Sequence, residues 1–142
     1  MWALFGAGLV GLASMGQPPQ PAVIVVDHDK VKAAFDKGSV TLIDTNNFKV
    51  MAGRRDAAGT VEIHELDTDI FYVLEGTATF VTGGQAIETT TTSPHEIRGK
   101  SIIGGDTRKL VKGDVIVIPA GVPHWFTEAS GPFLYYVVKV SK

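Results

Sequence analysis

The chain contains no cysteine, which excludes disulfides and any metal site built on thiolates. Histidine, aspartate and glutamate remain as the side chains that could bind a metal ion. Basic residues are also few, because 13 lysines and arginines stand against 15 acidic residues and leave a net charge of −2. Nucleic-acid binding usually needs a basic face, so the composition argues against that class of partner. Phosphate loops, nucleotide fingerprints and nucleophile–base triads are absent too.

The apolar N-terminal run, residues 1–16, is shorter than the roughly 20 residues that span a membrane. It is uncharged and resembles the apolar part of a secretory signal peptide without the basic start. A hydrophobic N-terminal arm is the alternative interpretation. Residues 17–22 follow as a proline-rich linker. We therefore expect a single domain over residues 23–142, a periplasmic or secreted location, and no membrane span in the mature chain.

One short helix is predicted near the start of this domain. Val23–Val26 reads as a strand by composition, and Asp27 is placed to cap the helix that follows. Val31, Ala34 and Phe35 form one apolar face at helical spacing, and a glycine at position 38 is a good stop signal.

Nearly all later signals favour strands. Gly83 and Gly84 fit a two-residue hairpin turn, and Ser93–Asp106 is predicted as a long loop with a short extended piece at Ser101–Ile103. Many short strands with glycine and proline between them predict an all-β barrel or sandwich. The predicted strands are Val40–Ile43, Phe48–Arg55, Thr60–Glu65, Ile70–Leu74, Thr77–Thr82, Gln85–Thr92, Thr107–Val111, Val115–Ile118, Trp125–Glu128 and Leu134–Val140.

The most distinctive stretch is residues 113–124. A Gly-Asp turn signal precedes Val115–Ile118, a β-branched run that predicts a short strand buried on both faces. Pro119 ends this strand, because proline cannot donate to a ladder. Gly121 and Pro123 then restrict the backbone that leads to His124. The stretch therefore predicts an imidazole held in one fixed place.

This stretch resembles the second conserved motif of the cupin family, G-x5-P-x-G-x2-H-x3-N. Gly113, Pro119, Gly121 and His124 occupy the motif positions, and Glu128 stands where asparagine is usual. The resemblance implies a small jelly-roll-like β-barrel in which His124 is a metal ligand. Together with the helix predicted above, the expected fold is a single cupin barrel with one short N-terminal helix.

The first cupin motif, G-x5-H-x-H-x3,4-E-x6-G, is matched less completely. His64 and Gly76 keep their places, Asp69 stands for the glutamate, Glu62 for the first histidine, and Asp56 for the leading glycine. The two motifs together cover about half of the chain. The resemblance implies one divalent metal ion, whether Zn, Fe, Mn, Ni or Cu, with four expected ligands: Glu62, His64, Asp69 and His124.

The residues themselves agree with that site but leave alternatives open. Glu62 and His64 are two apart on a predicted strand, so both point to the same face. An ion pair of Glu62 with Arg54 or Arg55 would be a different use of the carboxylate. Another register would make His64 the first histidine and put Leu66 in the second place. A metal-free polar pocket is the corresponding alternative for the whole site.

Two further histidines, His28 and His95, lie outside both motifs. Phe71 should share the face of Asp69, and Phe126 that of His124, so an aromatic-lined pocket for a small organic molecule is expected. The resemblance implies a metal-binding cupin, compatible with a dioxygenase, an isomerase or a lyase. A non-catalytic binding or sensing module and a structural barrel are the alternatives, because a fold does not choose a reaction.

We also expect a homodimer. Cupin barrels often pair through edge strands, so the resemblance implies such a pair. The alternating valines and tyrosines of Leu134–Val140 also leave apolar area that a small barrel has difficulty burying alone.

Overall fold

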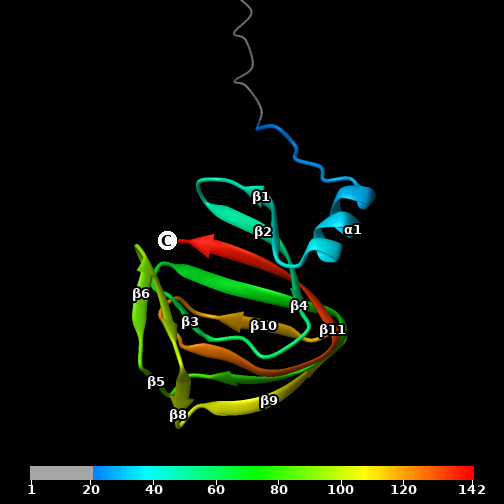
Figure 1. Ribbon diagram of the computed structural model, residues 1–142. Helices are drawn as coiled ribbons and strands as arrows, with labels where there is room; N and C mark the ends of the chain where they lie inside the picture. The colour runs from blue at the N-terminus through cyan, green and yellow to red at the C-terminus, as the bar shows by residue number, and fades with distance from the viewer. Residues whose placement is uncertain (1–20) are drawn as a thin grey trace, which may run out of the picture.

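The computed structural model describes residues 21–142. The expected signal segment 1–16 and the linker up to residue 20 lie outside the described residues. Residues 21–27 belong to no helix or strand, so the strand expected at Val23–Val26 is wrong for the single chain. The segment has no partner strand among the described residues, and Figure 1 shows it leading away from the barrel.

The predicted helix is confirmed as α1, which spans His28–Lys37. Asp27 occupies the N-cap position but makes no side-chain cap hydrogen bond, and Gly38 ends the helix with φ of 115°. Ala34 is buried, and the ring of Phe35 packs edge-on against Tyr136 with 5.5 Å between ring centres. No helix of residues 21–142 is long and apolar enough to cross a membrane.

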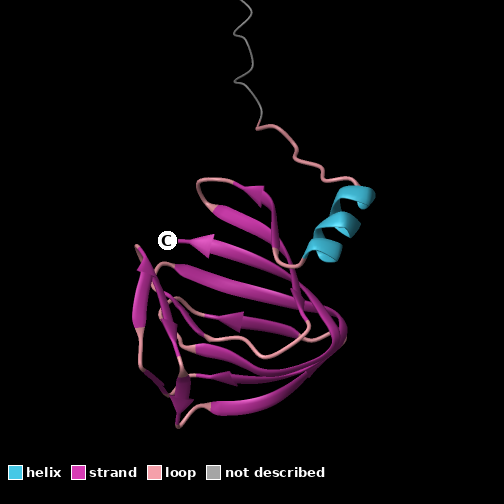
Figure 2. Ribbon diagram, viewed as in Figure 1, coloured by secondary structure: helices cyan, strands magenta, loops and turns pink. Residues whose placement is uncertain are grey.

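The described residues otherwise form strands, as Figure 2 shows. One sheet runs in the order β1-β2-β11-β3-β7-β6, with β4 joining β11 to β9 and β10, and β5 pairs separately with β8. The expectation of an all-β barrel with one short helix is confirmed. The strands are β1 (Val40–Asp44), β2 (Phe48–Arg55), β3 (Val61–His64), β4 (Asp67–Thr82), β5 (Gln85–Ile87), β6 (Thr90–Ser93), β7 (Glu96–Gly99), β8 (Ser101–Ile103), β9 (Asp106–Val111), β10 (Val115–Ile118) and β11 (His124–Ser141).

The frame of the barrel is the pair of long strands β4 and β11, which run antiparallel along almost their full lengths. Each had been expected as two separate strands. Both bend where Gly76 faces the irregular register between Ser130 and Leu134. Gly76 has φ of 78°, and a Cβ there would lie 2.5 Å from the carbonyl oxygen of Pro132. Glycine therefore allows the close approach that curls the sheet.

Three local expectations are corrected by pairing. Gly83 and Gly84 do form a turn, but it does not close a hairpin, because the end of β4 pairs with β9 while β5 pairs with β8. Gln85–Thr92 is divided between β5 and β6. The predicted loop Ser93–Asp106 contains β7, which pairs with β3.

The strand Val115–Ile118 is confirmed as β10, but it is not buried on both faces. Its residues alternate, with Val115 at 64% and Val117 at 59% exposure while Ile118 is buried. β10 pairs with β4 alone among the described strands, so it is an edge strand with one face toward the core.

The core fills one end of the barrel with aromatic rings. Phe80 and Phe126 lie 4.5 Å apart between ring centres, and Phe133 packs against Phe126 at 5.5 Å. The other end of the interior is polar and holds the predicted site residues. The buried core residues are Phe71, Val73, Ala78, Phe80, Leu110, Ile118, Phe126, Phe133, Tyr135 and Val137.

Candidate metal centre

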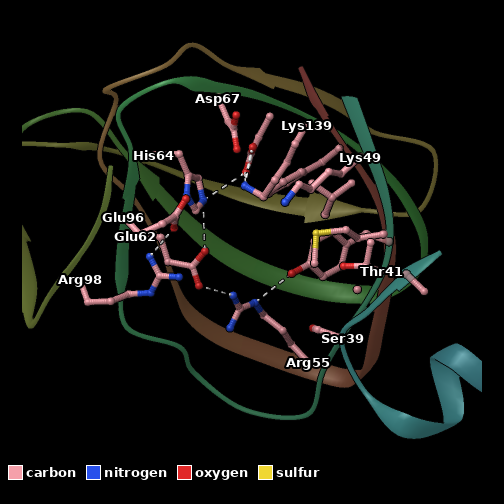
Figure 3. Close-up of a pocket in the computed structure, with 17 residues that line it drawn as sticks. Ser39, Thr41, Lys49, Arg55, Glu62, His64, Asp67, Glu96, Arg98 and Lys139 are labelled. Atoms are coloured by element: carbon pink, nitrogen blue, oxygen red, sulfur yellow. Dashed lines mark hydrogen bonds and ion pairs between the residues drawn. The ribbon is translucent and has the colours of Figure 1, made fainter. Parts of the chain in front are cut away.

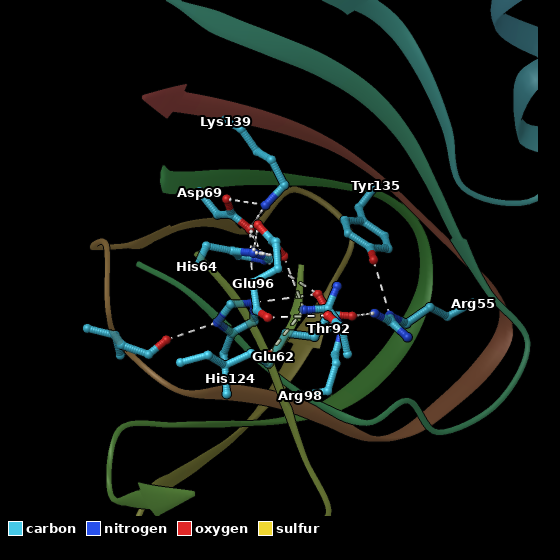
Figure 4. A network of polar contacts seen from close by, with 12 residues as sticks. Arg55, Glu62, His64, Asp69, Thr92, Glu96, Arg98, His124, Tyr135 and Lys139 are labelled. Carbon is cyan, nitrogen blue, oxygen red and sulfur yellow. Dashed lines mark hydrogen bonds and ion pairs between the residues drawn. The ribbon is translucent and has the colours of Figure 1, made fainter. Parts of the chain in front are cut away.

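The four predicted ligands come together at the polar end of the barrel. β3 supplies Glu62 and His64, the start of β4 supplies Asp69, and the first residue of β11 is His124. His124 is paired with Glu62 across the sheet, and the alternation along β3 turns Glu62 and His64 to the same side. Figure 4 shows these side chains pointing toward one another.

The two imidazoles are fixed through their Nδ1 atoms. His64 Nδ1 donates to Glu96 at 2.7 Å, and His124 Nδ1 donates to the carbonyl oxygen of Val122 at 3.1 Å. In the neutral form of each ring, Nε2 then carries a free lone pair. Both Nε2 atoms are buried and have no hydrogen-bond partner within residues 21–142. Buried polar atoms without partners are rare and costly, and metal-binding histidines usually donate their other ring nitrogen in this way.

The two carboxylate oxygens of Glu62 make different contacts. Oε2 lies 3.6 Å from His64 Nε2 and 3.9 Å from His124 Nε2, while Oε1 accepts a hydrogen bond from Arg55 Nη2 at 3.2 Å. One ligand atom each from Glu62, His64 and His124 lies within 4.8 Å of the others. This donor set suits a divalent metal ion, and the unpartnered Nε2 atoms face the space such an ion would take.

Arg55 is held firmly in its position. Its Nε donates to the hydroxyl of Tyr135 at 3.1 Å, and its guanidinium lies 4.5 Å from the ring centre of Phe126. A Cβ at Gly59 would meet Nη1 at 2.4 Å, so the absence of a side chain there leaves room for the guanidinium. The ion pair of Glu62 with Arg55, raised as an alternative, is present. It leaves Oε2 free, so it does not exclude a ligand role for Glu62.

Asp69 lies beside the imidazoles but is strongly held by a lysine. Both carboxylate oxygens accept hydrogen bonds from Lys139 Nζ, at 2.7 and 2.9 Å. Oδ2 also lies 3.5 Å from His64 Nε2 and 4.0 Å from His124 Nε2. Asp69 would have to share its oxygens between Lys139 and a metal ion, and its ligand role stays a prediction.

The surroundings of Glu62 and His124 favour the protonation states that a metal needs. Burial alone raises the pKa of Glu62, but the neighbouring His64 and the charge of Arg55 outweigh it and lower that pKa to about 2. Burial lowers the pKa of His124, and the nearby carboxylates offset this only in part. For His64, burial lowers the pKa, but Glu62, Asp69 and Glu96 raise it overall. At neutral pH Glu62 is therefore ionised and His124 neutral.

Three polar residues of the site were not predicted from the sequence. Glu96 and Arg98 fell in the region assigned to a loop, and Lys139 lay in a run taken as apolar. The alternation Glu-Ile-Arg could have indicated a strand with one polar face. Arg98 Nη1 donates to Glu96 Oε2 at 3.1 Å, so the partner of His64 is itself held.

The remaining histidines lie away from this centre. His95 pairs with Glu65 at 3.1 Å on the surface, where its side chain is 56% exposed. His28 begins α1 and is exposed.

A pocket of about 440 Å³ opens beside the centre, as Figure 3 shows. The buried side chains of Tyr135 and Phe71 line it. Ser39 and Thr41 lie on the side toward α1 (Figure 3). The pocket is more polar than the aromatic pocket expected from the sequence. Its charged lining residues are four bases, Lys49, Arg55, Arg98 and Lys139, and four acids, Glu62, Asp67, Asp69 and Glu96.

The comparisons agree with this architecture. The sequence model of the family described as Cupin matches residues 28–142, so the chain belongs to the cupin family. No curated protein matches the sequence. Among solved structures, BH2720 from Bacillus halodurans is similar with a TM-score of 0.57 and 19% identity, over 88% of this chain and 84% of that one.

Two further structures show the same fold at low identity. The DMSP lyase DddQ from Ruegeria pomeroyi has a TM-score of 0.53 at 18% identity, over 74% of this chain and 47% of that one. KdgF from Halomonas sp. also has a TM-score of 0.53, at 16% identity, over 73% of this chain and 77% of that one. At such identity the likeness carries the fold alone.

Proposed function

We propose that this cupin binds one divalent metal ion through Glu62 Oε2 and the Nε2 atoms of His64 and His124. The observation that carries the proposal is the pair of buried Nε2 atoms, both unpartnered within the described residues and both facing the free oxygen of Glu62. Their Nδ1 atoms are already bonded, which fixes the lone pairs toward a common point.

The ligand beside the metal is a small organic anion. The four basic and four acidic side chains that line the pocket balance each other, and the imidazole of His124 is neutral. A divalent ion would add two positive charges that no lining carboxylate offsets. An excess of positive charge in a partly closed pocket attracts anions, and a volume of about 440 Å³ suits a small molecule.

Tyr135 is placed to orient such an anion. Its hydroxyl oxygen accepts the hydrogen bond from Arg55 Nε, so its own proton is free to be donated into the pocket. Burial raises the pKa of Tyr135 more than the charge of Arg55 lowers it, which keeps the hydroxyl protonated. When bound, a divalent ion supplies Lewis-acid polarisation of a ligand oxygen. Isomerase, lyase and dioxygenase chemistry all fit this arrangement, and the likeness to a DMSP lyase does not choose among them.

A metal-free polar pocket is the second candidate, and one observation favours it. Each acidic residue around the histidines already has a basic partner: Glu62 with Arg55, Asp69 with Lys139, and Glu96 with Arg98. Such a pocket would bind a polar ligand through the protein groups alone and would act as a binding or sensing module.

Metal analysis separates the two candidates. Protein purified without an affinity tag should contain about one divalent ion per chain, and His64→Ala and His124→Ala should each lose most of it. Adding the metal should raise the melting temperature of the unchanged protein but not of these variants, because binding to the folded state alone stabilises it. His95→Ala is the matched control and should keep the metal, since that imidazole lies on the surface. Full metal content in both site variants would show that the metal is bound elsewhere, and the metal-free pocket would then be the better description of this site.

Glu62→Gln tests the third ligand. A large loss of metal would support ligation through Oε2, whereas full retention would make Glu62 a partner of metal-bound water or a general base. Calorimetry with simple carboxylates then tests the ligand class, comparing metal-loaded protein with chelator-treated protein. Binding should require the metal, and equal binding without it would contradict the charge argument.

A further inference from the structure

A row of four charged residues crosses the neighbouring strands β1, β2, β11 and β4 at one side of the pocket. Residues paired across a sheet point to the same face, and the strand register pairs each member of this row with the next. In order, the members are Asp44, Lys49, Lys139 and Asp69. The row therefore has an acid at each end and two lysines side by side in the middle, and both lysines line the pocket.

The outer contacts of the row are ion pairs, and the middle contact is not. Lys49 Nζ lies 3.4 Å from a carboxylate oxygen of Asp44, and Lys139 Nζ donates to both carboxylate oxygens of Asp69. Neither lysine has another ion-pair partner within residues 21–142. Like charges directly opposite each other on neighbouring strands repel. The space between the two ammonium groups is therefore where an added negative charge would be stabilised most.

Both lysines have donors to spare for such a charge. An ammonium group has three N–H donors, and the contacts of Lys139 with Asp69 use two of them. The contact of Lys49 with Asp44 joins side chains that are 43% and 58% exposed, and exposed pairs of this kind contribute little. Lys49 can therefore turn to a ligand at low cost. Figure 3 shows the two lysine side chains next to each other in the pocket.

The lysines lie close to the proposed metal centre. Oδ2 of Asp69 accepts from Lys139 Nζ at 2.9 Å and lies 3.5 Å from His64 Nε2, so a single carboxylate group separates the ammonium from the imidazole. Met51 and Val137 form the next pair along β2 and β11, and both line the pocket. A short ligand with an apolar middle can therefore contact the metal centre and the lysines together.

The charge of the metal-loaded pocket indicates how many negative charges the ligand carries. The basic and acidic side chains of the lining balance, so a bound divalent ion leaves an excess of two positive charges. One carboxylate would offset half of this excess, and two would offset all of it. The two lysines are already flanked by two acids, so the place between them suits one carboxylate better than a phosphate group with nearly two charges.

We propose that the ligand of this pocket is a short dicarboxylate whose second carboxylate binds between Lys49 and Lys139. Its first carboxylate lies at the metal centre, where the hydroxyl of Tyr135 donates to it. This inference rests on the proposed metal site, because the metal supplies the positive charge that the dianion balances. The two lysines then determine specificity, since an acid with only one carboxylate leaves them without a partner.

Calorimetry on the metal-loaded protein tests the inference with two acids of equal chain length, glutarate and pentanoate. Glutarate should bind about tenfold more tightly or better, because hydrogen bonds between charged groups are the strong ones. Lys49→Gln should remove this preference and leave the affinity for pentanoate unchanged. Lys49→Glu should weaken glutarate binding further, because the new carboxylate would itself pair with Lys139. Lys100→Gln is the matched control, since Lys100 pairs with the exposed Glu88 outside the pocket, and it should keep the preference.

The metal content of every sample separates this inference from the proposed function. If the protein holds its metal but binds glutarate and pentanoate equally, the dicarboxylate is wrong and the metal site stands. A preference that persists in Lys49→Gln, or tighter binding of inorganic phosphate than of glutarate, would overturn the inference as well. A protein that binds no divalent ion would contradict the proposed function itself, and the charge count that favours a dianion would fail with it.

Discussion

The two ends of the barrel interior are built by the same strands and differ sharply in chemistry. Along β4 the inward side chains are Asp69, Phe71 and Val73. The interior therefore changes from a carboxylate to apolar core side chains within five residues. Along β11 the change is from His124 to Phe126. The backbone register is continuous across the boundary, so side chains alone decide which end holds the site.

The two ends also differ in what they contribute to stability. The aromatic end removes apolar area from water, which is the main driving force of folding. The polar end holds buried charges whose desolvation offsets much of their mutual attraction, together with two unpartnered Nε2 atoms among the described residues. A site that costs stability without its ligand is typical of a functional region.

Phe133→Ala should have the largest effect on the fold. Phe133 is 0% exposed, and removing a buried phenylalanine side chain costs about 3–5 kcal/mol. Urea unfolding with and without a chelator should show the same loss of unfolding free energy, because the expected metal ligands lie at the other end. Phe48→Ala is the control, since Phe48 is 38% exposed and should cost well under about 1 kcal/mol. A loss that depended on metal would show that the two ends are not independent.

The sequence predicted the parts of the fold that depend on neighbouring residues. The helix that ends at Gly38 and the strands β2 and β10 follow from local apolar spacing and from turn residues. His124 could be predicted because proline and glycine fix the backbone around it.

Features that depend on distant pairing could not be predicted in the same way. The exposure of Val117 follows from the edge position of β10, and the partner of His64 follows from the pairing of β7 with β3. Neither is visible in a window of neighbouring residues. The same limit applies to Lys139, whose place beside Asp69 depends on the register of β11 against β4.

Arg55→Met should have the next largest effect, measured as a loss of metal affinity at the polar end. Arg55 holds Oε1 of Glu62 and turns Oε2 toward the imidazoles. Without it the carboxylate loses its orientation, and metal affinity should fall toward the upper end of the 10–100-fold typical of residues that orient metal ligands. Metal titration measures this. Arg54→Met is the matched control, because Arg54 bonds the exposed Asp56 and should leave metal affinity unchanged.

Glu96→Gln should have the smallest of the three effects, about tenfold in metal affinity, at the lower end of the range for such partners. The amide oxygen can still accept the proton of His64 Nδ1, so the ring keeps its tautomer and orientation, and only the negative charge that makes Nε2 a stronger donor is lost.

The chain contains a matched control for this change, because Glu65 makes the same kind of contact with Nδ1 of His95. That pair is exposed and lies outside the site, so Glu65→Gln should leave metal affinity unchanged. If the two variants bind metal equally well, the contact of Glu96 with His64 does not tune a metal ligand. The buried pair would then be an ordinary ion pair, as the surface pair is, and the polar end of the barrel would lose one of the features that distinguish it from a structural core.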